Sequence, residues 1–229
     1  MTTTFVLDAP PDTAWQRRLR FVVEVIDAVT GELIRDGIDV RVAGLAGQPI
    51  VNFGGRYVWL AERGAAPTEV SVDPKSRPFL PARVTAPAPP GPPPAPQYGV
   101  VSIVLAPTPA YPFETGTTGM RSTLVRAAAE KPTVPLSFDA IWLQWQDDTQ
   151  PPPAWSDAPV HSATDVAGDF AAIVRLGVQQ IARTDSQGLM RVRVAATHGG
   201  VTKFSPERQI RAGHVADLPS FAWDQFTSV

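Results

Sequence analysis

The chain has no cysteine among its 229 residues and only three histidines. The missing thiols exclude disulfide bonds, thiolate metal sites and cysteine nucleophiles, so packing alone must hold the fold together. His161, His198 and His214 do not occur at the spacing of two metal ligands on one helix, and we expect each to be a loop residue. The absence of disulfides agrees with assembly in a reducing compartment.

The sequence also lacks a surplus of positive charge and a long apolar run. Its formal net charge is −2, so it offers no basic field to attract nucleic acid or an anionic membrane. No apolar segment approaches the length of a membrane-spanning helix. The first residues, MTTTFVLDAPPDTAWQRR, have no basic region and a short apolar run, so they do not form a signal peptide. We therefore expect no nucleic-acid partner, no membrane insertion and no export by the general secretory route.

Catalytic motifs are missing as well. There is no GxSxG elbow, no P-loop and no GxGxxG that opens a helix. Asp147 and Asp148 are adjacent carboxylates on one predicted loop, whereas glycoside hydrolysis needs two carboxyl groups across a cleft. We predict that the chain is not an enzyme and uses no cofactor and no metal.

Proline is present in excess, at 25 residues. Because proline breaks helices and interior strands, this number favours short strands and many loops. Residues 86–96, APAPPGPPPAP, favour the polyproline II conformation. We interpret them as a stiff loop, because the strand-like segment YGVVSIVL follows at 98–105; a ligand for a proline-binding domain is the alternative.

Alternation of apolar and polar residues predicts several strands. In the first, at 20–26, Phe21, Val23 and Val25 share one face. A turn at 27–31 then leads toward a second strand at 38–42. Further strands are predicted at 56–61, 68–72, 80–84, 98–105, 138–145, 169–176, 189–195 and 201–204, and a short helix at 124–130, where LVRAAAE is rich in helix formers.

Two heptapeptides repeat one pattern, TDVAGDF at 164–170 and TDSQGLM at 184–190. In each, the Asp side chain can close an Asx turn and the Gly can take the left-handed conformation, as in hairpin turns. A calcium site built from Asp165, Asp169 and Asp185 is the alternative. Neither heptapeptide has a dense run of carboxylates, so we favour structural turns.

The segment VEVIDAVTGELIRDGIDVRV at 23–42 resembles the opening hairpin of transthyretin-like, carboxypeptidase-regulatory-type β-sandwiches. The two heptapeptides are similar to the Thr-Asp-x-x-Gly-x-Phe turn of that family, although Met190 takes the aromatic position in the second. The resemblance covers 20–105 and 118–204, and it implies a non-catalytic accessory, stalk or assembly module. LAPTPAYPFETGTTGMRSTLV at 105–125 resembles the junction of tandem sandwich proteins in phage tails and contractile injection machines.

The predicted fold class is all-β, with two Ig-like or transthyretin-like antiparallel β-sandwiches in tandem. An extended arm is expected at 1–17. The first sandwich is expected at 18–108, including the proline-rich loop 86–96. The second is expected at 118–212, followed by an aromatic tail at 213–229.

Two groups of residues are candidates for binding. Apolar side chains near the chain ends can dock on a partner or, for the tail, pack on their own domain; they are Phe5, Val6, Leu7, Phe221, Trp223 and Phe226. Trp142, Trp145 and Trp155 can stack on a sugar, although core packing is the favoured interpretation. Because Trp142 and Trp145 are three residues apart, a strand would place them on opposite faces.

The sequence therefore predicts a non-catalytic structural, assembly or adaptor subunit of a larger protein particle, whose partners are other protein subunits. The resemblance at 105–125 implies a phage tail or a contractile injection machine, with assembly in the cytoplasm before the protein becomes part of a virion or injection particle. The alternative is a carbohydrate- or surface-binding β-sandwich module with a glycan as its ligand.

Overall fold

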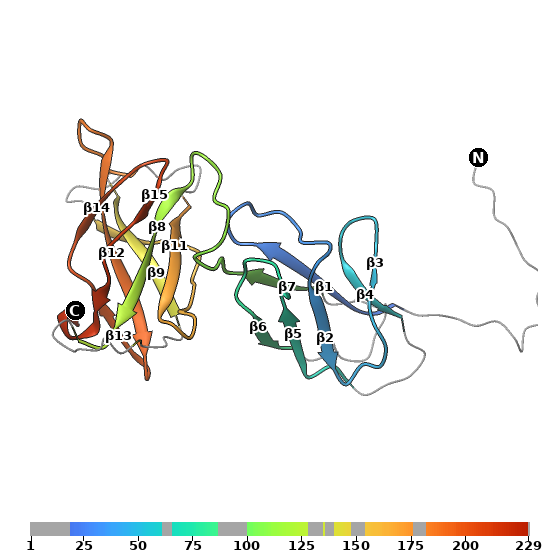
Figure 1. Ribbon diagram of the computed structural model, residues 1–229. Coiled ribbons are helices and arrows are strands. Elements are labelled where there is room, and N and C mark those ends of the chain that lie inside the picture. The colour runs from blue at the N-terminus through green and yellow to red at the C-terminus, as the bar shows by residue number, and fades with distance from the viewer. Residues whose placement is uncertain are drawn as a thin grey trace, which may run out of the picture.

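The computed structural model describes residues 19–60, 66–86, 100–127, 135, 140–147, 154–175 and 182–228. Within these ranges the regular structure is strand, apart from the 3-10 helix η2 (Trp223–Gln225), so the all-β prediction is confirmed. We call residues 19–105 the N-terminal half and residues 118–228 the C-terminal half. Figure 1 shows β1–β7 gathered on one side of the view and the labelled strands from β8 onward on the other.

The strands of the N-terminal half are β1 (Leu19–Asp27), β2 (Asp39–Ala43), β3 (Ile50–Val51), β4 (Tyr57–Leu60), β5 (Glu69–Asp73), β6 (Ala82–Thr85) and β7 (Val100–Leu105). They form one sheet in the order β3-β4-β1-β7 and another in the order β2-β5-β6. Strand β1 is antiparallel to β4 and parallel to β7. Alternate residues of both sheets, such as Val23, Val40 and Ile103, meet in one buried cluster, which is the packing of a β-sandwich.

The strands of the C-terminal half are β8 (Thr118–Val125), β9 (Ala140–Asp147), β10 (Ala154–Asp157), β11 (Asp169–Val174), β12 (Leu189–His198), β13 (Val201–Phe204), β14 (Arg208–Arg211), β15 (Val215–Asp217) and β16 (Phe221–Ala222). One sheet has the order β10-β9-β12-β13, with β14 also paired to β12. The other has the order β11-β8-β15, with β16 also paired to β8. Strands β15 and β16 run parallel to β8. Residues 215–222, predicted as part of a tail, are thus built into the sheet region.

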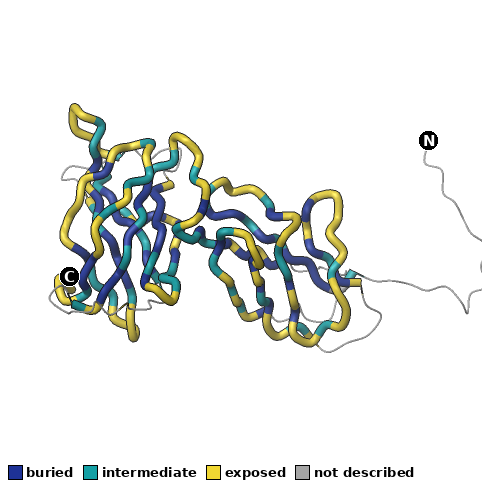
Figure 2. The backbone as a smooth tube through the Cα atoms, in the orientation of Figure 1, coloured by how far each residue is buried: buried dark blue, intermediate teal, exposed yellow. Residues whose placement is uncertain are grey.

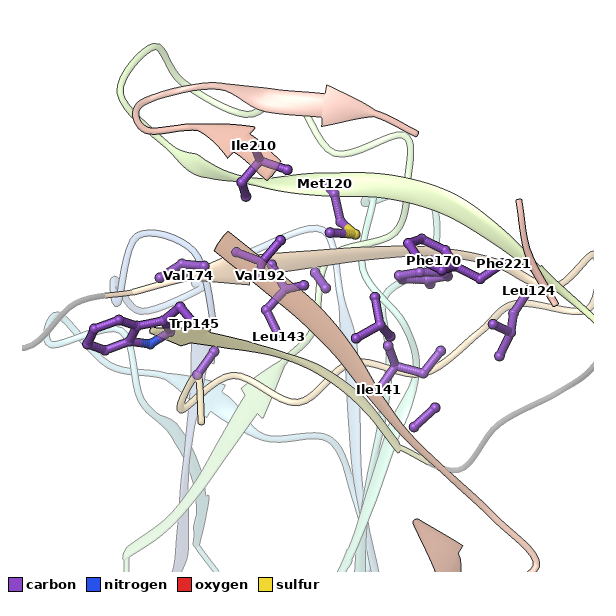
Figure 3. Packing of buried hydrophobic residues seen from close by; sticks show 14 of the residues in the cluster. Met120, Leu124, Ile141, Leu143, Trp145, Phe170, Val174, Val192, Ile210 and Phe221 are labelled. Atoms are coloured by element: carbon purple, nitrogen blue, oxygen red, sulfur yellow. The ribbon is translucent and has the colours of Figure 1, made fainter. Parts of the chain in front are cut away.

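A second buried cluster fills the space between the two sheets of the C-terminal half. Met120 and Phe170 from one sheet and Leu143 and Val192 from the other lie together there (Figure 3). Figure 2 shows that buried backbone follows the strands in both halves, while the turns are exposed. The period-two pattern therefore places apolar side chains in one buried cluster in each half. The tandem arrangement of two sandwiches stays a prediction.

A third, smaller cluster connects the halves. Ala28 from the N-terminal half is buried against Val160 and Ile173 from the C-terminal half, and Val29 and Phe113 pack around them. The halves therefore contact each other through buried apolar side chains. The domain boundaries predicted from the sequence stay a prediction.

The predicted hairpin between the first two strands is wrong. The turn itself forms, because the Asp27 carboxylate accepts the Val29 amide at 2.7 Å and the Gly31 amide donates to the Asp27 carbonyl at 2.8 Å. Strand β2 then pairs with β5 in the opposite sheet, and β7 takes the place beside β1. Alternation determines which face of a strand is buried, and it is the same for a hairpin and for a crossing between sheets.

The predicted helix at 124–130 is also wrong where the structure describes it. Leu124 and Val125 end strand β8, and Leu124 is fully buried beside Phe221 of β16. Core packing outweighs the intrinsic helix preference of these residues. Residues 128–130 and most of the proline-rich segment, 87–96, lie outside the described residues. In the part of the chain that the structure describes, no helix is long and apolar enough to cross a membrane.

Candidate functional site

A row of aliphatic side chains crosses the outward face of the sheet β3-β4-β1-β7. Cross-strand pairing aligns Ile50 with Val58, Val58 with Val22, and Val22 with Val100. Paired residues point to the same side of a sheet. The chain neighbours of Val22, Val58 and Val100 point into the core, so this row lies on the side away from it.

Three more aliphatic residues extend the row. Ile26 is paired with Val104 on the same side of β1 and β7, and Leu60 follows Val58 two positions along β4. Ile50 and Val104 are 52% and 54% exposed. We call this set the aliphatic face: Val22, Ile26, Ile50, Val58, Leu60, Val100 and Val104.

Three described polar residues on this side of the sheet bind one another. The Arg56 Nε donates to the Glu24 carboxylate at 2.6 Å, and the Ser102 hydroxyl donates to its other oxygen at 3.1 Å. The pair is neutral in sum. This polar cluster lies between the pairs Val22–Val100 and Ile26–Val104. A sheet face that meets water is ordinarily polar, so the exposed aliphatic residues on both sides of the cluster indicate an interaction site.

The three tryptophans proposed to stack on a ligand lie in two environments. Trp145 is fully buried in the core of the C-terminal half, where it cannot reach a ligand. Trp142 is partly buried on the outer face of β9; its indole N–H donates to Asp157 at 2.6 Å, and its ring stacks on His161 at 4.5 Å. The prediction that Trp142 and Trp145 face opposite sides is confirmed. Trp155 lies on the same outer face, paired with Gln146.

Arg193 of β12 is the centre of this outer face. Its guanidinium lies 4.5 Å from the Trp155 ring and 4.3 Å from the Phe204 ring. Its Nε donates to the Gln144 side chain at 2.6 Å, and Gln144 in turn donates to Asp157 at 2.7 Å. Burial lowers the pKa of the Arg193 guanidinium below its ordinary value, so the charge is partly desolvated. Two rings and one hydrogen bond therefore hold this cation in a fixed position.

A hollow of about 490 Å³ lies on the same side of the sheet; its lining residues are Gln146, Arg183, Thr184, Asp185, Leu189, Arg191 and Gln209. Gln146 connects the hollow to Trp155, because these two residues are cross-strand partners. Arg191 and Arg193 are two positions apart on β12 and share one face. The hollow and the stacked guanidinium therefore form one continuous surface.

The aromatic residues near the C-terminus pack on their own half. Phe221 and Phe226 are 3% and 5% exposed and belong to the core, and Trp223 is partly buried against it. The Trp223 and Phe226 rings are 5.3 Å apart. A docking role for these rings requires the segment to leave the core, and that role stays a prediction. Phe5, Val6 and Leu7 lie outside the described residues.

The two repeated heptapeptides form the same turn. The Asp165 carboxylate accepts the amides of Ala167 and Asp169 at 2.8 and 2.9 Å, and the Asp185 carboxylate accepts those of Gln187 and Leu189 at the same distances. Gly168 and Gly188 have φ of 80° and 72°. The Asx-turn prediction is confirmed.

The other predicted polar residues are dispersed. Asp147 ends β9 opposite Ala154, and Asp148 lies outside the described residues. His198 is the last residue of strand β12, so the expected loop position is wrong for this residue, and it contacts Trp223 edge-on at 6.2 Å. His161 and His214 are loop residues as expected, and His214 is exposed. Among the described residues no three His, Asp or Glu side chains come close enough to hold a metal ion.

Sequence reasoning missed both outer faces. The aliphatic face had a signal, since YGVVSIVL at 98–105 is apolar on both sides of the strand, whereas a half-buried strand alternates. Arg193 had none, because alternation predicts only that it points outward. Its neighbours Trp155 and Phe204 are separated from it by 38 and 11 positions in the chain, and only the strand order brings them together.

No family model matches the sequence, and no curated protein matches it. Two solved structures are similar in part. The Bacillus anthracis TIE protein matches over 87% of this chain and 32% of its own, with 10% identity and a TM-score of 0.24. The Streptococcal ancillary pilin matches over 87% of this chain and 61% of its own, with 9% identity and a TM-score of 0.25. The chain spans less than two thirds of either protein, and TM-scores this low carry no argument about function.

Proposed function

We propose that the chain is a non-catalytic assembly or adaptor subunit of a larger protein particle. The observation that supports this proposal is the aliphatic face on the outward side of the sheet β3-β4-β1-β7. Ile50, Leu60, Val100 and Val104 are its exposed members, Ile26 and Val58 are partly buried, and Val22 is buried. Val100 and Val104 remain half exposed, so their burial by another subunit removes apolar surface from water. Full burial of such a side chain stabilises an association by about 1.5–3 kcal/mol.

The partner is another protein subunit that presents an apolar surface. Among the described side chains on this side of the sheet, the charged residues Arg56 and Glu24 form an ion pair with each other and leave no net charge to attract an ion or a nucleic acid. Its side chains are short and branched, and they form a flat pleated surface that fits a second sheet or a helix packed against it. Interfaces of lasting assemblies are apolar in this way.

The particle we infer is a phage tail or a contractile injection machine. The support is the sequence resemblance at 105–125 alone. In the structure this segment contains Tyr111, which is buried in the core of the N-terminal half, Phe113, which packs against the cluster between the halves, and then strand β8. Assembly in the cytoplasm followed by incorporation into the particle is part of the same proposal. Tail, sheath or baseplate genes beside the gene for this chain would support it; polysaccharide-processing genes would contradict it.

The test places a charge on the aliphatic face. Val104→Lys and Ile50→Lys put an ammonium group on exposed positions, so each variant is expected to fold as the parent does and to lose association. Val201→Lys is the matched control, because Val201 is 50% exposed in β13 of the other half. Sedimentation velocity and co-purification from the native host measure assembly. Association that survives both substitutions, with circular dichroism unchanged, contradicts the proposal.

A further inference from the structure

The hollow beside Arg193 has the dimensions and the chemistry of a ligand site. Its volume of about 490 Å³ lies within the range of small-molecule pockets. Its backbone groups are already paired: the Arg183 amide donates to the Gln146 carbonyl at 3.0 Å, and the Asp185 amide donates to the Leu189 carbonyl at 2.9 Å. A peptide added as a strand therefore has little free backbone here, and recognition must come from side chains.

The side chains of the hollow suit a polyhydroxylated ligand with negative charge. The amides of Gln146 and Gln209 can both donate and accept hydrogen bonds, as sugar hydroxyls do. The Arg191 side chain is 59% exposed, and its nearest carboxylate, that of Glu207, is 3.8 Å away. That separation is too long for a direct hydrogen bond. The planar fork of Arg191 is therefore in place to bind a carboxylate in a bidentate way.

A second cation and a ring border the hollow. Arg193 lies two residues beyond Arg191 on the same face of β12, held between Trp155 and Phe204. Because this guanidinium is already fixed, binding an anion costs little side-chain entropy. Trp155 is partly buried, carries Arg193 over its ring and is the cross-strand partner of Gln146. The rest of its apolar ring surface suits the C–H face of a sugar ring.

We propose that this surface binds an acidic oligosaccharide, a chain of sugar rings that carry carboxylates. One carboxylate pairs with Arg191, and a neighbouring sugar lies along Trp155 and Arg193. The amides of Gln146 and Gln209 bind hydroxyls between them. This ligand is independent of the aliphatic face, which lies on the other half of the chain.

The test titrates the full chain with three acidic tetrasaccharides: tetragalacturonate, tetraguluronate and a hyaluronan tetrasaccharide. Fully methyl-esterified tetragalacturonate is the uncharged probe, and pentaglutamate is the acidic peptide probe. Isothermal titration calorimetry gives the affinity. Arg191→Gln and Arg193→Gln are the site variants. Arg41→Gln is the matched control, since it removes one charge from an exposed side chain of the N-terminal half.

At least one acidic tetrasaccharide is expected to bind, and each site variant is expected to weaken that binding by at least about tenfold, whereas Arg41→Gln leaves it unchanged. Arg191→Gln keeps the test valid if Arg193→Gln disturbs the fold, because the Arg191 side chain is mostly exposed. The proposal is overturned if no acidic tetrasaccharide binds at millimolar concentration, or if both site variants bind as the parent does. If the methyl ester binds as tightly as the acidic tetrasaccharides, the ligand does not need carboxylates and that part of the proposal is wrong. If pentaglutamate binds as tightly, the ligand does not need sugar rings and the assignment to a saccharide is wrong.

Discussion

Two buried tyrosines in the core of the N-terminal half should respond in opposite ways to the same substitution. The Tyr111 hydroxyl donates to the Asp27 carboxylate at 2.5 Å. The Tyr57 hydroxyl is buried and has no hydrogen-bond partner among the described residues. Both rings belong to one core cluster and are 8% and 4% exposed. Replacing either by Phe removes one oxygen and leaves the ring in place.

The magnitudes follow from what each hydroxyl does. A hydrogen bond to a charged group contributes about 1.5–3 kcal/mol, so Tyr111→Phe should lower the free energy of unfolding by about 2 kcal/mol. The Asp27 carboxylate keeps the Val29 amide as a donor, which holds the loss to that range. A buried hydroxyl without a partner costs about 1–3 kcal/mol. Tyr57→Phe relieves that cost but loses some packing, and should raise the free energy of unfolding by about 1 kcal/mol.

Urea unfolding followed by tryptophan fluorescence measures both changes, because Trp59 lies in the same core. The midpoint should move up for Tyr57→Phe and down for Tyr111→Phe, with an unchanged slope. If the two variants lose the same stability, hydrogen bonding does not separate these residues and the reasoning is wrong. The double variant tests independence; the two effects should add.

Four other outcomes are expected. Burial raises the pKa of Tyr57 to about 12, so the folded state holds this proton more tightly than the unfolded state. The contribution of this proton to the free energy of unfolding is therefore complete below about pH 10 and declines as the pH rises toward 12. In urea titrations the parent should lose about 1 kcal/mol more than Tyr57→Phe between about pH 9 and pH 11. Gly119→Ala should lower the melting temperature, because the new Cβ would lie 2.6 Å from the Ala172 carbonyl oxygen. Overpacking of this kind costs about 1–3 kcal/mol. An unchanged melting temperature would contradict this close approach of the two strands. Asp185→Ala should cost about 1 kcal/mol in urea unfolding, whereas Asp185→Asn keeps the acceptor for the Gln187 amide and most of the stability. Phe221→Ala should lower the stability of the C-terminal half by about 3–5 kcal/mol, and a loss below about 1 kcal/mol would show that the segment is not part of the core.

Alternation in the sequence predicted much of the fold because burial on one face is a local property of a strand. It located β1 within one residue at each end and β13 at Val201–Phe204. It could not predict that β1 pairs with β7, because any strand with the same pattern can fill that place. Strands β3, β8, β10, β14, β15 and β16 were not predicted. Strands β3, β15 and β16 have two or three residues, too few to show a period, and the burial of β8 does not alternate strictly.

The candidate surfaces were less predictable than the fold. Trp142 and Trp155 were identified as residues of interest, but their chemistry depends on Asp157 and Arg193 across the strands. The repeated Asp turns were predictable in detail, since all their hydrogen bonds lie within five residues. A site is readable from one sequence when its members are close in the chain, and these surfaces are built from side chains on different strands.

The parallel pairing of β1 with β7 has a consequence for the order of events in folding. The contact of Glu24 with Ser102 joins positions 78 apart, and the contact of Ser122 with Pro219 joins positions 97 apart. Loops of that length must close before β1 pairs with β7 and before β8 pairs with β15 and β16. The closure of long loops makes folding slow. On the ribosome, β4 can pair with one edge of β1 first, while the other edge of β1 stays unpaired until β7 is synthesised from Val100 onward. The protein therefore depends on keeping its first strand from pairing with another chain during that interval.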